Sequence, residues 1–255
     1  MTDKIAVVIL SAGQGKRIGK VYSGVPKALL TVGGEPMIRR MVRSVEQSGV
    51  ASEIVDVVGP TIYDAIRDAL PGSVKLAIQE QPLGTGHALG CARGSVRAAH
   101  VISLYGDHPF ITPETIKAVA AKHLKTGATL TLATVKVTDF EDWRSFFYDW
   151  GRIIRDASGH FFRITEFKDC TPEEKKITEV NPGFYCFESA WLWNHIDRLQ
   201  NTNAQGELYV TDLLAMAVSE GMRVESVLVT DPRTAIAINT PEHLELAEKL
   251  VNEVI

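Results

Sequence analysis

The sequence predicts an α/β fold, a three-layer sandwich in which helices cover both faces of a mostly parallel central sheet. Short apolar runs rich in β-branched residues alternate along the chain with segments whose apolar residues recur at a helical period. The runs are apolar on both sides, as strands buried on both faces are. The chain has 255 residues and shows no internal repeat or linker, so we expect one compact domain over residues 1–255.

The expected elements have glycine or proline at many of their boundaries. Residues 36–48 are typical, because Pro36 occupies the first helical position and Gly49 follows the end. Strands are predicted at residues 5–10, 53–58, 74–79, 100–105, 128–137 (alternating), 222–229 and 235–239, with a hairpin of 151–156 and 161–168 and a strand pattern over 179–188. Helices are predicted at 36–48, 61–70, 88 to about 96, 112–125, 172–176, 189–200, 211–220 and, capped by Thr240, 241 to about 254.

Composition narrows the function classes. The formal net charge is −4 and no block of Lys and Arg occurs, which argues against an extended nucleic-acid surface. The three cysteines are widely spaced and form no CxxC pair, as in a reducing cytoplasm, and we interpret them as small hydrophobic residues. No signal peptide or membrane-spanning pattern is present. We therefore expect a cytoplasmic protein that contacts neither nucleic acid nor membrane.

A glycine-rich loop follows the first strand. It contains small residues and cations: Ser11, Ala12, Gly13, Gly15, Arg17 and, after Pro26, Lys27. Glycines let backbone N–H groups approach an anion, and open α/β sheets bind ligands at the carboxyl ends of their strands. The loop matches neither GxxxxGK[ST] nor GxGxxG. A polyphosphate site and an ordinary turn are both compatible with it.

Two more strand ends carry polar residues. In QEQPLGTGHA (79–88), Gln79 and Thr85 beside Gly84 have the hydrogen-bonding groups needed to read a base edge, although a tight turn with His87 as a satisfied loop residue is the alternative. Asp107 follows the strand 100–105. A carboxylate there can ligate Mg²⁺ together with phosphate oxygens, or it can simply hold the turn. We interpret His108 as structural.

The second half of the chain is less explicit. Glu166 and Asn181 are polar residues within apolar strand patterns. They could bind sugar hydroxyl and amide groups, or be satisfied by neighbouring backbone. Residues 138–150, here called the aromatic segment, place six aromatic residues among acids. This segment could be core, a lid or a partner surface.

Taken together, the motifs resemble the sugar-1-phosphate nucleotidylyltransferases, and most closely the uridyltransferase (pyrophosphorylase) domain of bacterial N-acetylglucosamine-1-phosphate uridyltransferases. The resemblance covers nearly the whole chain in the family's order. It rests on LSAGxGxR (10–17) with Pro26-Lys27, PLGTGHA (82–88), LYGD (104–107), GRI (151–153), IxExKD (164–169), ExNxG (179–183), NAQGE (203–207) with Thr211-Asp212, and Asn239.

The resemblance implies a Rossmann-like fold of the nucleotide-diphospho-sugar transferase type and gives residues their roles. The reaction it implies joins UTP to N-acetylglucosamine 1-phosphate, releasing pyrophosphate, with Mg²⁺ as cofactor; assembly of identical copies is compatible with it. The implied nucleotide-binding residues are Leu10, Ala12, Gly13, Gly15, Gln79, Gly84 and Thr85; the catalytic residues are Arg17, Lys27 and Asp107; the metal ligands are Asp107 and Asn239; the sugar-binding residues are Gly151, Glu166 and Asn181.

The chain departs from the family in four places. It stops after the helix at 241–254, so a hexapeptide-repeat acetyltransferase domain is not expected. The aromatic segment replaces a shorter stretch, Pro182 stands where a small hydroxyl residue is usual, and Ser11 replaces alanine. These changes keep two alternatives open: the same fold acting on another pair (UTP or dTTP with another hexose 1-phosphate, or CTP with another acceptor), and a non-catalytic nucleotide-sugar sensor.

Overall fold

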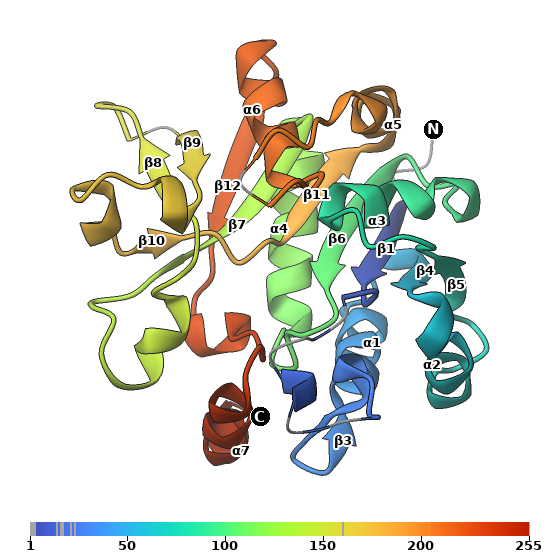
Figure 1. The fold of residues 1–255 in the computed structure, drawn as a ribbon. Helices are drawn as coiled ribbons and strands as arrows, with labels where there is room; N and C mark the ends of the chain where they lie inside the picture. The colour runs from blue at the N-terminus through green and yellow to red at the C-terminus, as the bar shows by residue number, and fades with distance from the viewer. Residues whose placement is uncertain are drawn as a thin grey trace.

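The computed structural model describes residues 4–13, 15, 18–20, 22, 24–159, 161–203 and 205–254. Across these residues ten strands form one mixed sheet in the order β5–β4–β1–β6–β11–β7–β10–β8–β9, with β12 pairing with β7 (Figure 1). The strands are β1 (Ile5–Leu10), β4 (Ala51–Val58), β5 (Lys75–Ile78), β6 (His100–Tyr105), β7 (Leu130–Lys136), β8 (Arg152–Arg155), β9 (Phe161–Thr165), β10 (Glu179–Val180), β11 (Tyr185–Glu188) and β12 (Val224–Leu228); β2 (Thr31–Val32) and β3 (Glu35–Pro36) form a separate hairpin.

Helices cover both faces of the sheet, which confirms the predicted architecture. One face packs against α1 (Met37–Ser48), α2 (Tyr63–Ala69), α4 (Pro113–Thr126) and α7 (Pro241–Val254). The other packs against α3 (Thr85–Cys91), α5 (Ser189–His195) and α6 (Thr211–Ser219). The side chains of β1 alternate between the two cores, and all six of its residues are buried. Within the described residues, no helix has the length and hydropathy needed to span a membrane.

The parallel strands bring three loops to one edge of the sheet. β1 pairs in parallel with β4 and β6, and β4 with β5. Hydrogen bonds continue past the strand ends: the N–H groups of Ser11, Gln79 and Gly106 donate to strand carbonyls at 2.8, 2.8 and 3.0 Å. The loops that start at Ser11, Gln79 and Gly106 therefore leave the sheet side by side, where open α/β sheets bind their ligands.

Several predictions for individual strands are wrong. β7 is buried on both sides rather than alternating, because helices cover both faces of the sheet at its position between β11 and β12. Residues 235–239 form no strand: a 3₁₀ turn (Pro232–Ala235) precedes them, and Ile238 N donates to Asp107 O at 2.9 Å. The pattern over 179–188 is two strands, separated at Gly183, whose φ is 80°.

Some predicted helices are shorter. α3 begins at Thr85 and ends at Cys91, followed by a 3₁₀ turn, and α5 ends at His195. The helix predicted at 172–176 is a 3₁₀ turn (Glu174–Lys176). The hairpin of β8 and β9 and the Thr240 cap of α7, which accepts from His243 N at 3.2 Å, are confirmed.

The aromatic segment packs as part of the core and the cleft wall. Phe146 and Phe147 are buried. Arg152 of β8 is fully buried beneath the segment, donates to the carbonyls of Tyr148 and Trp150, and places its guanidinium 4.7 Å from the Phe140 ring centroid. The core interpretation therefore accounts for most of the aromatic side chains of this segment, although Tyr148 is exposed. The end of the segment at Asp149 and Trp150 reaches the cleft described below.

A buried histidine pair at the opposite end of β6 makes stability depend on pH. His123 of α4 is 0 % exposed, and its Nε2 lies 3.1 Å from His100 Nδ1 and its Nδ1 3.1 Å from Thr131 Oγ1. Burial, and next the neighbouring His100, lower the pKa of His123 to about 4. The folded protein therefore keeps this imidazole neutral at pH values where the unfolded chain protonates it.

We expect the free energy of unfolding to fall as pH drops from about 6.5 to about 4, with His123 contributing up to about 3 kcal/mol. Above pH 6.5 both states are neutral at this position and the contribution is fully present. Denaturant unfolding of the wild type and His123→Gln at pH 7 and pH 5 measures it. The variant should lose less stability between the two pH values, and equal losses would contradict the assignment.

Candidate functional site

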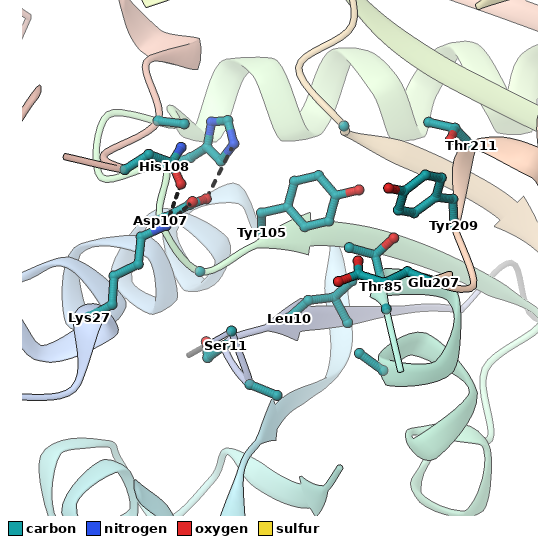
Figure 2. Close-up of a pocket in the computed structure, with 18 of the residues that line it drawn as sticks. Leu10, Ser11, Lys27, Thr85, Tyr105, Asp107, His108, Glu207, Tyr209 and Thr211 are labelled. Atoms are coloured by element: carbon teal, nitrogen blue, oxygen red, sulfur yellow. Dashed lines mark hydrogen bonds and ion pairs between the residues drawn. The ribbon is translucent and has the colours of Figure 1, made fainter. Parts of the chain in front are cut away.

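A cleft of about 790 Å³ opens at the carboxyl ends of β1, β5 and β6 (Figure 2). Nearly all of the residues predicted from the sequence line it: Leu10, Ala12, Gly13, Gly15, Lys27, Gln79, Gly84, Thr85, Asp107, Gly151, Glu166, Asn181 and Asn239. Arg17 lies outside the described residues. The structure thus brings together side chains from the first to the last quarter of the chain.

Lys27 joins the two predicted metal ligands. Its Nζ donates to Asp107 Oδ2 at 2.5 Å and to Asn239 Oδ1 at 2.8 Å. Lys27 begins a 3₁₀ turn after Pro26, and Gly15 lies so close that an added Cβ would be 3.1 Å from Lys27 Cβ. The bond from Ile238 N to Asp107 O fixes the backbone before Asn239. An ammonium, a carboxylate and an amide oxygen therefore converge at one end of the cleft (Figure 2).

The Asp107 carboxylate is held in its charged form. Burial raises its pKa, but the Lys27 ammonium and His108 outweigh burial and bring the pKa below its usual value. Oδ1 is buried and has no hydrogen-bond partner among the residues that the structure describes. His108 Nε2 lies 3.5 Å from Oδ1, while its Nδ1 donates to Ala235 O at 2.9 Å. Burial lowers the pKa of His108, which is 2 % exposed.

This arrangement fits a divalent cation. The described part of the chain contains no group of three or more His, Cys, Asp and Glu side chains able to hold a metal. Mg²⁺ is commonly bound by one or two carboxylates together with substrate phosphates. Asp107, with one buried oxygen unpaired, and Asn239 offer oxygen ligands, and the Lys27 ammonium already marks a position for positive charge between them.

The middle of the cleft is built by two loops bound to each other. Gly86 N donates to Leu208 O at 2.7 Å, Leu208 N to Leu83 O at 2.8 Å, and Val210 N to Thr85 Oγ1 at 3.1 Å. Gly84 has φ 111°, and a Cβ there would lie 2.5 Å from Leu208 O. The glycines of PLGTGHA are therefore required by the close approach of the NAQGE loop, which explains why the two motifs occur together.

Gly151, Glu166 and Asn181 form the other end. A Cβ on Gly151 would lie 2.9 Å from Ile164 Cγ2 and 3.5 Å from Glu166 Oε2. Asn181 is partly satisfied by its own loop, since its Nδ2 donates to Tyr185 Oη at 2.6 Å and its Oδ1 accepts from Gly183 N at 3.0 Å. Neighbouring groups therefore hold Asn181, as one interpretation expected, and Asn181 also lines the cleft.

Several residues that line the cleft received no role from the sequence: Tyr105, Asp149, Trp150, Glu207, Tyr209 and Thr211. Tyr105 and Tyr209 point their hydroxyl groups toward one another (Figure 2). Burial, and then nearby acids led by Glu207, raise the pKa of Tyr209 to about 12. Burial also raises the pKa of Glu166, with Asp212 and Asp169 adding to it. The signal was available, because most of these residues lie within or next to the motifs LYGD and NAQGE.

Comparison with known proteins confirms the predicted resemblance. The chain is 39 % identical over 250 residues to the bifunctional protein GlmU of Geobacter sulfurreducens, covering 96 % of this chain and 50 % of that protein. It is 37 % identical over 251 residues to the bifunctional protein GlmU of Caldicellulosiruptor saccharolyticus, covering 98 % and 52 %. The chain thus spans about half the length of these curated relatives.

The fold has solved counterparts. A crystal structure from Bacillus anthracis, described as a candidate glucose-1-phosphate thymidylyltransferase in complex with a sucrose, superposes with a TM-score of 0.79 at 20 % identity, covering 98 % of this chain and 96 % of that one. This likeness supports the Rossmann-like α/β fold. The model of the MobA-like NTP transferase domain matches residues 7–209. The chain belongs to the MobA-like NTP transferase domain family.

Proposed function

We propose that this chain transfers a uridylyl group from UTP to N-acetylglucosamine 1-phosphate, forming the UDP-sugar and pyrophosphate. The convergence of Lys27, Asp107 and Asn239 at one end of the cleft, which the expected nucleotide-binding and sugar-binding residues also line, carries the proposal. The similarity to the GlmU proteins over nearly the whole chain supports it. The choice of UTP and of the N-acetylated sugar rests on the motifs shared with the uridyltransferases.

The chemistry needs no activated side chain. A phosphate oxygen of the sugar 1-phosphate attacks the α-phosphorus of UTP; the new P–O bond forms as the bond to the β-phosphate oxygen breaks, and pyrophosphate leaves. The protein must position both substrates and offset the negative charge that gathers on the transferred group. In this proposal Lys27, with Arg17 from the glycine-rich loop, supplies positive charge to the phosphates, the usual dominant contribution in such sites.

Asp107 and Asn239 would hold Mg²⁺, which supplies further charge neutralisation to the phosphates when bound. At the other end, Glu166 and Asn181 would bind the sugar, with Gly151 leaving room for the approach. The Glu166 carboxyl group accepts hydrogen bonds from sugar hydroxyls. Because it is partly buried beside Asp212 and Asp169, this end of the cleft favours neutral hydrogen-bond donors over a second anion.

Pyrophosphate release across a panel of nucleotides and sugar phosphates tests the proposal. With Mg²⁺ present, UTP and N-acetylglucosamine 1-phosphate should give the highest kcat/KM among UTP, dTTP, CTP and GTP, each with N-acetylglucosamine, glucosamine, glucose and galactose 1-phosphates. A faster pair elsewhere in the panel would replace the substrate assignment. Tight product binding with no turnover on any pair would favour a sensor and overturn the proposal.

Replacing the bridging lysine tests the catalytic role of charge. We expect Lys27→Ala to lower kcat by a factor on the order of 10³–10⁵, by analogy with arginine fingers at other phosphoryl-transfer sites. Lys75→Ala is the matched control, because Lys75 is half exposed and pairs with Glu53 away from the cleft. Thermal unfolding of both variants shows whether a loss of activity comes from the missing charge or from an unfolded protein. Near-wild-type turnover by a folded Lys27→Ala would refute the catalytic role of Lys27.

Replacing the carboxylate tests the metal site. Asp107→Asn keeps the shape of the side chain and an oxygen for Lys27 but removes the negative charge, so the Mg²⁺ concentration at half-maximal rate should rise about tenfold or more. Asp64→Asn, at an exposed position paired with Arg67, is the control. Calorimetric Mg²⁺ titration with UTP gives a second readout. An unchanged Mg²⁺ concentration at half-maximal rate would show that Asp107 is not a metal ligand. The proposed uridylyl transfer would still stand.

A further inference from the structure

The side chain of Gln79 is held in one orientation at the wall of the cleft. Gln79 follows β5, lines the cleft and is only 5 % exposed. Its Nε2 lies 3.0 Å from Gly84 O and 3.0 Å from His87 Nδ1. A backbone carbonyl only accepts hydrogen bonds, so the atom facing Gly84 O is the amide nitrogen.

Both N–H groups of the amide are therefore in use. One donates to Gly84 O and the other to His87 Nδ1, which requires His87 to be neutral with its proton on Nε2. Gln79 Oε1 is left without a hydrogen-bond partner in the described part of the chain, although the residue lines the cleft. The cleft thus meets the acceptor end of Gln79 and not its donor end.

The position of His87 is set independently of Gln79. Its backbone lies in the first turn of α3, which the bond from Gly86 N to Leu208 O attaches to the neighbouring loop. Gly86 packs so tightly that a Cβ there would lie 2.3 Å from Leu199 Cδ1. The backbone that carries the imidazole is consequently fixed, and the ring presents Nδ1 to the amide of Gln79.

We propose that His87 is a positioning residue for base selection: by accepting from Gln79 Nε2 it directs Gln79 Oε1 toward the nucleotide base. This inference rests on the proposed use of UTP. Uracil carries an N–H at ring position N3 that can donate to Oε1. Cytosine carries a lone pair there, which would face the oxygen lone pairs and leave both groups unpaired. A buried polar group without a partner is what gives such sites their discrimination.

Two substitutions distinguish the loss of the hydrogen-bond acceptor from the loss of the volume of the imidazole ring. His87→Leu keeps a branched side chain of similar size without an acceptor, whereas His87→Asn places an oxygen near the position of Nδ1. The measurement is calorimetric affinity for UTP and for CTP without acceptor sugar. Since His87 supplies one of two hydrogen bonds, His87→Leu should lower the ratio Kd(CTP)/Kd(UTP) about fivefold. His87→Asn should stay within about twofold of the wild type on the same scale.

The possible results of these affinity measurements test the role of His87 independently of the proposed uridylyl transfer. A wild type that binds UTP no better than CTP, or a folded His87→Leu with an unchanged ratio, overturns the role of His87 even if turnover is normal. Should the ratio respond as expected while no pair of the substrate panel reacts, the reaction fails and the base selection stands. Equal loss of affinity for both nucleotides in both variants would indicate a merely structural histidine and overturn the proposal.

A measurement on the wild type covers variants that do not fold. NMR of protein labelled with ¹⁵N-histidine reports which ring nitrogen of His87 carries the proton at neutral pH. The inference requires an unprotonated Nδ1 and a protonated Nε2. A proton on Nδ1 would make the ring a donor toward Gln79 and would overturn the proposal.

Discussion

The contact of the Lys27 ammonium with Asp107 and Asn239 is the constraint on which the rest of the site depends. Asp107 is a partly buried carboxylate with one oxygen fully enclosed, and a buried charge without a partner is strongly destabilising. Lys27 supplies the partner and also binds an amide 212 residues away in the sequence. The glycine-rich loop, the end of β6 and the segment before α7 are thereby held around one positive charge.

The contact of Lys27 with Asp107 and Asn239 also explains the positions of neighbouring residues whose roles look unrelated. Gly15 has no side chain, which lets Lys27 pass within contact distance. Residues 236–238 are buried and extended without joining the sheet, because Ile238 donates to the carbonyl of Asp107. His108 presents one nitrogen toward Asp107 Oδ1 and donates from the other to Ala235 O. The backbone hydrogen bond from Ile238 to Asp107, together with the Lys27 ammonium, thus holds the segments that carry the side-chain oxygens of Asp107 and Asn239. In the proposed function these oxygens would bind a divalent cation.

The sequence was sufficient for the architecture because strand ends fix positions in a parallel sheet. The residues at the ends of β1, β5 and β6 were placed at one edge by that rule, and the cleft lies there. The same rule could not predict the contacts between distant segments. Nothing in the local pattern indicates that Lys27 reaches Asn239 or that Gly84 lies against Leu208, because these approaches depend on how loops pack after the sheet has formed.

Errors in the prediction have the same origin. Residues 235–239 are apolar enough for a strand, yet Ile236 N donates to Arg233 O, Ile238 N to Asp107 O and Asn239 N to His243 Nδ1, and none of these acceptors belongs to a strand. The burial of β7 depends on its place between β11 and β12, and both of these strands come from later parts of the chain. One of the two interpretations of residues 79–88 made His87 a satisfied loop residue; the structure places it in the first turn of α3, with its Nδ1 in a hydrogen bond. What the sequence could not indicate is that its partner is the side chain of Gln79.

In the proposed reaction, the distribution of charge along the cleft would orient the sugar 1-phosphate. Positive charge from Lys27 lies at one end, and Glu166, Glu207, Asp169 and Asp212 surround the other, where burial and mutual repulsion raise the pKa values of Glu166 and Tyr209. Tyr105 lies between the two ends, and burial, with smaller contributions from Glu166 and Asp107, raises its pKa. A sugar 1-phosphate is itself polarised, with an anion at one end and neutral hydroxyls at the other. Its phosphate is attracted toward Lys27 and repelled by the acids, whereas its hydroxyls can donate to them. In the proposed reaction, these charges would therefore favour the orientation that places the phosphate of the sugar beside the nucleotide.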